Sequence, residues 1–212
     1  MREYLRLLHL PTTSCILAFA LIGSTSAPII YFDRLLWLLI QLFLIGGVAA
    51  NYFDELKGRP WHTTMPRIHL WSIGFIALTA SSLIGLYFVV TLSFEFAIFV
   101  VLWAFFTLAY DLELFNGRFH NTPSLAFSWS SIYLGSYYLQ SLTITPRSLL
   151  LSTVLGCIAG QGRNLYEEAK PFSKDGITSS PESTKSAWTL LKTLILCINL
   201  IALIMLSYRL ML

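Results

Sequence analysis

Long apolar runs alternate with short polar segments along the whole chain. A helix needs roughly 20 apolar residues to cross a bilayer, and most of these runs come close to that length. Strands are not indicated, because the runs are long and lack the alternating pattern of a membrane barrel. The pattern predicts about seven membrane-spanning helices, at residues 10–32, 35–53, 68–90, 94–110, 122–142, 148–162 and 187–208.

Composition agrees with this pattern. The chain has 212 residues, of which 56% are hydrophobic and 12% are charged, whereas a soluble domain is about half apolar and a quarter charged. We therefore expect an all-α, polytopic transmembrane bundle, with residues 1–212 forming a single integral membrane domain. Asp33 and Arg34 are expected in a tight turn, and Gly46 and Gly47 are expected to let helices pack closely.

The distribution of Lys and Arg predicts an orientation. Placing the N-terminus in the cytoplasm leaves only Arg34, Arg147 and Arg209 outside, while Lys192 lies within the last run and can snorkel. The cytoplasmic segments then hold Arg2, Arg6, Lys57, Arg59, Arg67, Arg118, Arg163, Lys170, Lys174 and Lys185. The net charge of +3 is small and scattered, so no nucleic-acid partner is expected.

A short acidic phrase occurs twice, each time at the end of an apolar run. The first acidic phrase is NYFDELK at 51–57, and the second acidic phrase is NLYEEAK at 164–170. Carboxylates at the edge of a bilayer are costly to desolvate and usually have a function. If the helix continues through the first phrase, Asn51 shares one face with Asp54 and Glu55. Two copies indicate two halves of one polar site.

The residue types in these phrases indicate metal–phosphate chemistry. Amide and carboxylate oxygens are hard ligands suited to Mg²⁺, which commonly bridges protein carboxylates and substrate phosphates. Lys57, Arg59 and Arg67 lie near the first phrase in sequence and could contact phosphate oxygens, and Arg163 directly precedes the second phrase. The segment 110–120 contains a turn signal in Asn-Gly, and its Tyr110 and Arg118 could line the mouth of a cavity between the phrases.

With these residues in view, the chain resembles the UbiA superfamily of intramembrane aromatic prenyltransferases. That family is all-helical, with nine spans around a central cavity, acidic motifs after the second and sixth spans, and a tyrosine-containing stretch after the fourth. Here NYFD at 51–54 is similar to the family's NDxxD opening. FDELKGRP at 53–60 and YDLELFNGRFHN at 110–121 look like a divergent branch. The resemblance covers residues 8–187.

The resemblance implies Mg²⁺-dependent transfer of an isoprenyl group from a polyprenyl diphosphate to a lipid-soluble acceptor, such as an electron-rich aromatic ring. Carried over by position, the catalytic residues are Asn51, Asp54, Asn164 and Glu167. The expected metal ligands are Asp54, Glu55, Glu167 and Glu168. The expected substrate contacts are Lys57, Arg59, Tyr110, Arg118 and Arg163.

The chain also departs from the family pattern. Gly58 and Pro171 occupy positions where the family has Asp, and Asn164 and Glu167 replace Asp in the second motif. The family's two further spans would have to be replaced by a second copy or a partner subunit. Two alternatives stay open: a catalytically silent membrane subunit or lipid-binding protein, and a small transporter in which the two phrases mark structural repeats.

Overall fold

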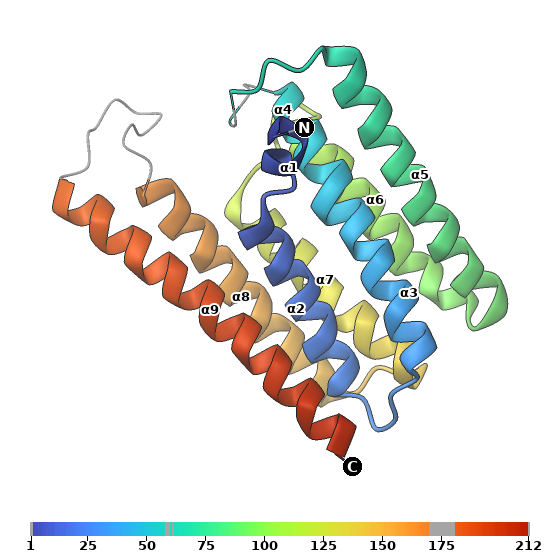
Figure 1. The fold of residues 1–212 in the computed structure, drawn as a ribbon. Coiled ribbons are helices and arrows are strands. Elements are labelled where there is room, and N and C mark those ends of the chain that lie inside the picture. Colours follow the sequence, from blue (N-terminus) through green and yellow to red (C-terminus); the bar gives the residue numbers. More distant parts are fainter. Residues whose placement is uncertain (1, 58–59, 61, 170–180, 212) are drawn as a thin grey trace.

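The long helices lie alongside one another, and the two ends of the chain lie at opposite ends of the bundle (Figure 1). The structure is a computed structural model that describes residues 2–57, 60, 62–169 and 181–211. Within those residues every regular element is a helix, which confirms the all-α prediction. In chain order the elements are α1 (Arg2–Leu7), α2 (Leu10–Thr25), α3 (Phe32–Leu42), the π-helix η1 (Phe43–Ala49), α4 (Ala50–Leu56), α5 (Arg67–Thr91), the 3₁₀ turn η2 (Phe94–Phe96), α6 (Ala97–Asp111), α7 (Thr122–Ser141), α8 (Pro146–Ala169) and α9 (Pro181–Met211).

Several helices are long and apolar enough to cross a membrane. Four qualify by length and composition: Phe32–Leu56, Arg67–Thr91, Phe94–Asp111 and Ser183–Met211. The apolar helix α2 is shorter, with 16 residues. These helices are compatible with an integral membrane protein, whereas the count of seven spans stays a prediction.

Helices α2 and α7 form the centre of the bundle. Helix α7 packs against α2, α6 and α8, and α2 also packs against α9. The inner position of α7 explains its polar composition, because Ser131, Ser136 and Gln140 are buried among neighbouring helices rather than exposed on the surface. Phe19 of α2 and Trp129 of α7 meet edge to face, with ring centroids 5.1 Å apart.

Two helix boundaries differ from the sequence prediction. Asp33 and Arg34 lie in the first turn of α3, not in a tight turn; the chain reverses before Phe32. Asp33 is favourable there because the start of a helix carries partial positive charge. Helix α8 does not end at Gly162 but continues to Ala169, so most of the second acidic phrase is helical.

The close packing predicted for Gly46 and Gly47 is confirmed. Both lie in η1 against α2, where a Cβ on Gly46 would be 2.7 Å from Ile16 Cδ1 and one on Gly47 would be 2.7 Å from Thr13 Cγ2. Helices α3, η1 and α4 form one continuous helical segment from Phe32 to Leu56. Its π-helical part lies directly before the first acidic phrase, and π-helical turns are frequent near functional sites.

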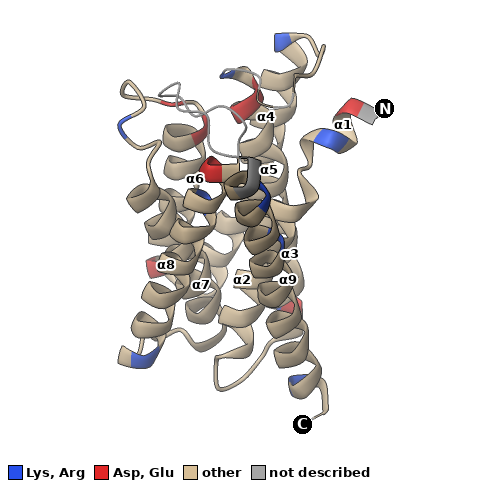
Figure 2. Ribbon diagram, turned by 90° about the vertical axis from the view of Figure 1, so that its left-hand side faces the viewer, with Lys and Arg blue, Asp and Glu red and all other residues tan. Residues whose placement is uncertain are grey.

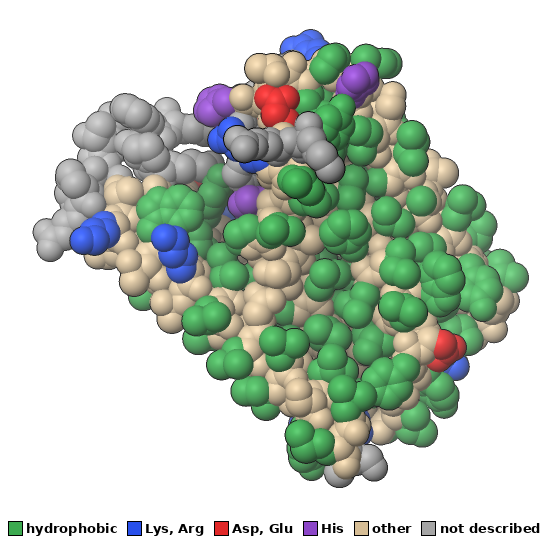
Figure 3. Space-filling model, viewed as in Figure 1, with side chains coloured by type: hydrophobic (Ala, Val, Ile, Leu, Met, Phe, Trp, Pro, Cys, Tyr) green, Lys and Arg blue, Asp and Glu red, His purple; other side chains and the backbone are tan. Residues whose placement is uncertain are grey.

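Charged side chains are concentrated at one end of the bundle. Figure 2 shows most Asp, Glu, Lys and Arg residues near α1, α4 and the adjoining end of α6, and fewer at the opposite end. Between the two ends, hydrophobic side chains cover much of the face seen in Figure 3. The charged end also contains the ends of α4, α6 and α8, which the sequence analysis placed on one side of the membrane.

Candidate functional site

A cavity of about 650 Å³ lies among α2, η1, α4, α6, α7, α8 and α9. This central cavity contains residues from both acidic phrases: Asp54 comes from α4 and Glu167 from α8. Helix α6 adds Tyr110 and Asp111. Its volume lies within the usual range for small-molecule sites, roughly 300–1,000 Å³. Two acidic segments that are far apart in sequence therefore border one space.

The central cavity changes from polar to apolar along its length. Most of its charged residues lie toward helix ends at the charged end of the bundle: Lys57, Asp54, Asp111, Glu113, Arg163 and Glu167; Lys192 lies further along α9. Its other wall residues lie further along the same helices and include Leu42, Trp103, Ile158 and Ile198. Asp54 and Leu42 are 12 residues apart on one helical segment, which is roughly 18 Å along the axis. An amphiphile with an anionic head and an apolar tail fits this gradient.

The side chains of the first acidic phrase point in different directions. Asn51 and Asp54 line the central cavity, together with Lys57. The Asn51 amide Nδ2 also donates to the carbonyl oxygen of Gly47 in η1, at 2.8 Å. Glu55 is fully buried elsewhere and accepts hydrogen bonds at 2.8 Å from both the backbone N–H and the hydroxyl of Thr63. Glu55, a predicted metal ligand, therefore fixes the chain after α4 and does not line the central cavity.

In the second acidic phrase, a different set of positions lines the cavity. Glu167 lines the central cavity, whereas Glu168 is exposed and lies outside its wall. Asn164 also lies outside the wall, and its Oδ1 accepts a hydrogen bond from the Thr122 hydroxyl at 2.9 Å. Of the predicted residues Asn164, Glu167 and Glu168, Glu167 is therefore the one that lines the central cavity.

Arg163 connects three parts of the site. Its Nε donates to the Tyr110 hydroxyl at 2.7 Å, its Nη1 to Thr122 Oγ1 at 2.9 Å, and its Nη2 to the carbonyl oxygen of His120 at 3.2 Å. The His120 ring stacks on Tyr110, with centroids 4.4 Å apart. A guanidinium group has five N–H donors, so two remain for a ligand beyond these three bonds to described residues. Arg163 is thus held rigidly on the cavity wall.

One predicted substrate contact, Arg118, does not line the central cavity. Arg118 is exposed in the segment between α6 and α7, outside the cavity wall. Arg59 lies outside the described residues. The predicted Asn116-Gly117 turn is present, with φ of 58° and 73°.

The sequence analysis missed several residues of the central cavity. Asp111 and Glu113 lie beside the predicted Tyr110, and Lys192 enters from α9. Asp111 is the last residue of an apolar helix, and Asp54 lies near the end of another. A carboxylate at the end of an apolar run could therefore have predicted Asp111 as a site residue.

His9, in the left-handed region at the start of α2, also lines the cavity, and burial lowers its pKa. Its imidazole is therefore neutral at pH 7.

The carboxylates of this wall suit a hard cation. Asp54, Asp111 and Glu167 come from three different helices, and Mg²⁺ needs only one or two protein carboxylates when substrate phosphates supply further oxygens. In the described part of the chain, no three Asp, Glu, His or Cys residues lie close enough together to hold a metal ion by themselves.

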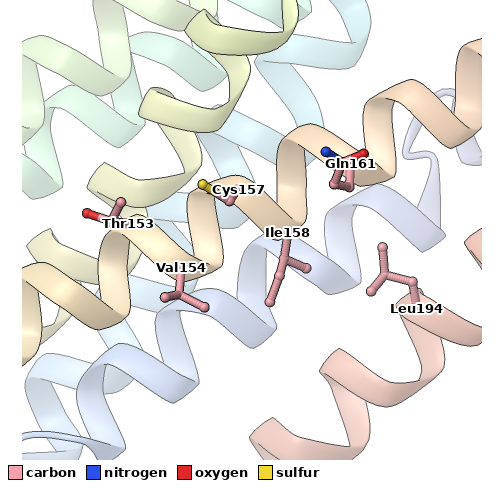
Figure 4. A pocket seen from close by; sticks show the side chains of 6 residues that line it. All are labelled: Thr153, Val154, Cys157, Ile158, Gln161 and Leu194. Carbon is pink, nitrogen blue, oxygen red and sulfur yellow. The ribbon is translucent and has the colours of Figure 1, made fainter.

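A second, smaller depression of about 340 Å³ lies between α8 and α9 (Figure 4). Its wall consists of Thr153, Val154, Cys157, Ile158, Gln161 and Leu194. None of these six described residues is charged, so the depression offers no counterpart to the charged end of the central cavity.

Comparison with known proteins finds no matching family model, no matching curated protein and no matching solved structure. The functional argument therefore depends on the residues of the central cavity.

Proposed function

We propose that the chain is an intramembrane prenyltransferase of the UbiA type, which transfers an isoprenyl group from a polyprenyl diphosphate to a lipid-soluble acceptor. One observation carries this proposal: a single cavity joins Asp54 and Glu167 at its charged end and continues into an apolar interior. A prenyl diphosphate has the same division between an anionic head and a hydrocarbon tail.

The residues of the cavity can be assigned roles on this basis. One or two of the carboxylates Asp54, Asp111 and Glu167 would hold Mg²⁺, and the diphosphate would supply its further oxygen ligands. When bound, Mg²⁺ would neutralise the negative charge of the leaving group. Arg163 and Lys57 would contact phosphate oxygens, since both line the same wall. Tyr110 orients the Arg163 guanidinium through its hydroxyl.

In the proposed reaction, the bond between the allylic carbon and the diphosphate oxygen breaks, and the electron pair leaves with the diphosphate. The acceptor forms a new bond to that carbon and loses a proton to water. The apolar wall, which includes Trp103 and Phe106, would exclude water from the allylic carbon before the acceptor attacks. Aromatic ring faces there would also favour the developing positive charge.

A second candidate is a protein that binds a prenyl diphosphate or related lipid without turnover. The use of Glu55 and Asn164 in internal hydrogen bonds favours it, because those two residues of the acidic phrases then do not contribute to catalysis. Both candidates require the central cavity, but only the first requires diphosphate release.

Release of diphosphate from a labelled isoprenyl diphosphate tests the proposal. The purified chain would be assayed in lipid nanodiscs with a panel of donors and aromatic acceptors, with Mg²⁺ and with EDTA. We expect Mg²⁺-dependent release that disappears in Asp54→Asn and Glu167→Gln. Tight donor binding without release would favour the second candidate. Neither binding nor release with any donor would refute both.

A further inference from the structure

A positively charged residue of the last helix borders the central cavity. Lys192 lies in α9, within a segment that is apolar enough to cross a membrane, and it lines the cavity while remaining exposed at its edge. A charged residue in such a helix is costly unless it reaches water or a partner, so it commonly marks a binding site. The sequence alone indicated only that its side chain could snorkel.

One face of α9 is directed at the cavity. Trp188, Lys192 and Ile195 all line it, at spacings of four and three residues, which places them on the same side of a helix. The indole of Trp188 packs edge to face on Tyr166 of α8, with centroids 6.2 Å apart. This contact fixes the Lys192 face beside the second acidic phrase.

The register of α8 and α9 places two cations at a similar depth. Helices α8 and α9 pack against each other, with Trp188 at the level of Tyr166. Lys192 is one turn further into the bundle than Trp188, and Arg163 is about one turn further in than Tyr166 and Glu167. Lys192 and Arg163 therefore lie further in than Glu167, toward the apolar interior.

Lys192 shares the central cavity with Asp54, Asp111 and Glu167. Its ammonium group and the Arg163 guanidinium are the kind of cations that bind phosphate oxygens through charge-assisted hydrogen bonds. At their depth, further in than Glu167, they are suited to the oxyanion that joins a polar head to its apolar tail.

We propose that Lys192 binds the phosphate group nearest the hydrocarbon tail of the ligand, together with Arg163. This assignment rests on the proposed function, because it takes the ligand to be a prenyl diphosphate. It gives α9 a direct part in binding: its charge holds the ligand head from the side opposite α4 and α6.

The test measures binding of inorganic diphosphate, with Mg²⁺, to the full chain in nanodiscs of neutral phosphatidylcholine by isothermal titration calorimetry. We expect Lys192→Ala to weaken binding about tenfold, the effect of losing one charge-assisted hydrogen bond, and Lys192→Arg to retain most of it. Lys185→Ala is the matched control. Lys185 lies seven residues earlier on α9, is exposed and is outside the cavity wall, so its variant should bind within about twofold of the wild type.

The outcomes separate the two proposals. Absence of diphosphate binding by the wild-type chain would refute the proposed function and this inference with it. Equal binding by wild type and Lys192→Ala would overturn only the role of Lys192. A third outcome concerns lipid headgroups. If phosphatidylglycerol in the nanodiscs weakens diphosphate binding to the wild-type chain but not to Lys192→Ala, then Lys192 binds a lipid headgroup. That result would also overturn the assignment. Size-exclusion profiles and melting temperatures of the variants check that they are folded.

Discussion

The two acidic phrases share a sequence pattern, but their side chains have different surroundings. In the first, the Asn amide donates to the Gly47 carbonyl, whereas in the second the Asn oxygen accepts from the Thr122 hydroxyl. Glu55 is fully buried and Glu168 is exposed. The position occupied by Asp54 and Glu167 is the one whose carboxylate lines the central cavity in both phrases.

This difference shows what the repeated pattern specifies. One carboxylate in each phrase faces the ligand space, and its neighbours are free to stabilise the fold or meet solvent, because adjacent residues on a helix point about 100° apart. Substitutions at equivalent positions of the two phrases should therefore give unequal effects everywhere except at Asp54 and Glu167.

The largest effect is expected at this shared position. Asp54→Asn and Glu167→Gln keep the shape of each side chain and remove its charge, so each should lower diphosphate release at least about 100-fold, as loss of a key electrostatic group typically does. Glu168→Gln should retain nearly full activity, because Glu168 lies outside the cavity wall. Steady-state rates of release measure all three. Equal losses in Glu167→Gln and Glu168→Gln would contradict the comparison.

The second-largest effect is a loss of folding stability, which we expect on substitution of Glu55 but not of Glu168. Glu55→Ala removes the acceptor for the Thr63 backbone N–H and hydroxyl, so we expect a loss of about 2 kcal/mol in the free energy of unfolding. Glu168→Ala, on the surface, should change it by no more than about 0.5 kcal/mol. Equilibrium unfolding of the detergent-solubilised chain gives both values, and a larger cost at Glu168 would reverse the assignment.

The smallest effect separates the two asparagines. Asn51→Asp loses the amide donor to the Gly47 carbonyl and sets a negative charge against that oxygen, so it should cost about 1.5 kcal/mol of stability. Asn164→Asp keeps an oxygen that accepts from Thr122 and should cost less than about 0.5 kcal/mol. The same unfolding measurement applies. Equal costs would show that the two amides have the same role.

Much of the fold follows from the sequence, because uncharged runs of near-membrane length have few alternatives to helices. The boundary errors have local causes. The predicted span ended at Gly162, where the uncharged run stops, but α8 continues to Ala169. Gly160 within it packs closely on α7, where a Cβ would lie 3.2 Å from Thr122 Cγ2. The π-helical turns of η1, at Phe43–Ala49, gave no signal in the sequence.

Less of the candidate site could be predicted. The repeated phrase indicated that Asp54 and Glu167 belong to one polar site, and both line one cavity. The directions of Glu55 and Glu168 depend on where the following chain and the neighbouring helices lie. Asp111 and Lys192 lie on other helices, so only tertiary packing brings them to the same wall.

The most direct test of the central claim is the distance between the two phrases in the folded chain. Spin labels would be attached to Asp54→Cys and Glu167→Cys, in a chain whose Cys15, Cys157 and Cys197 are replaced, and their separation measured by double electron–electron resonance in nanodiscs. A shared cavity predicts a narrow distribution well below about 20 Å. A mean near the ~30 Å thickness of the hydrocarbon core would place the phrases on opposite sides of the membrane and contradict the account.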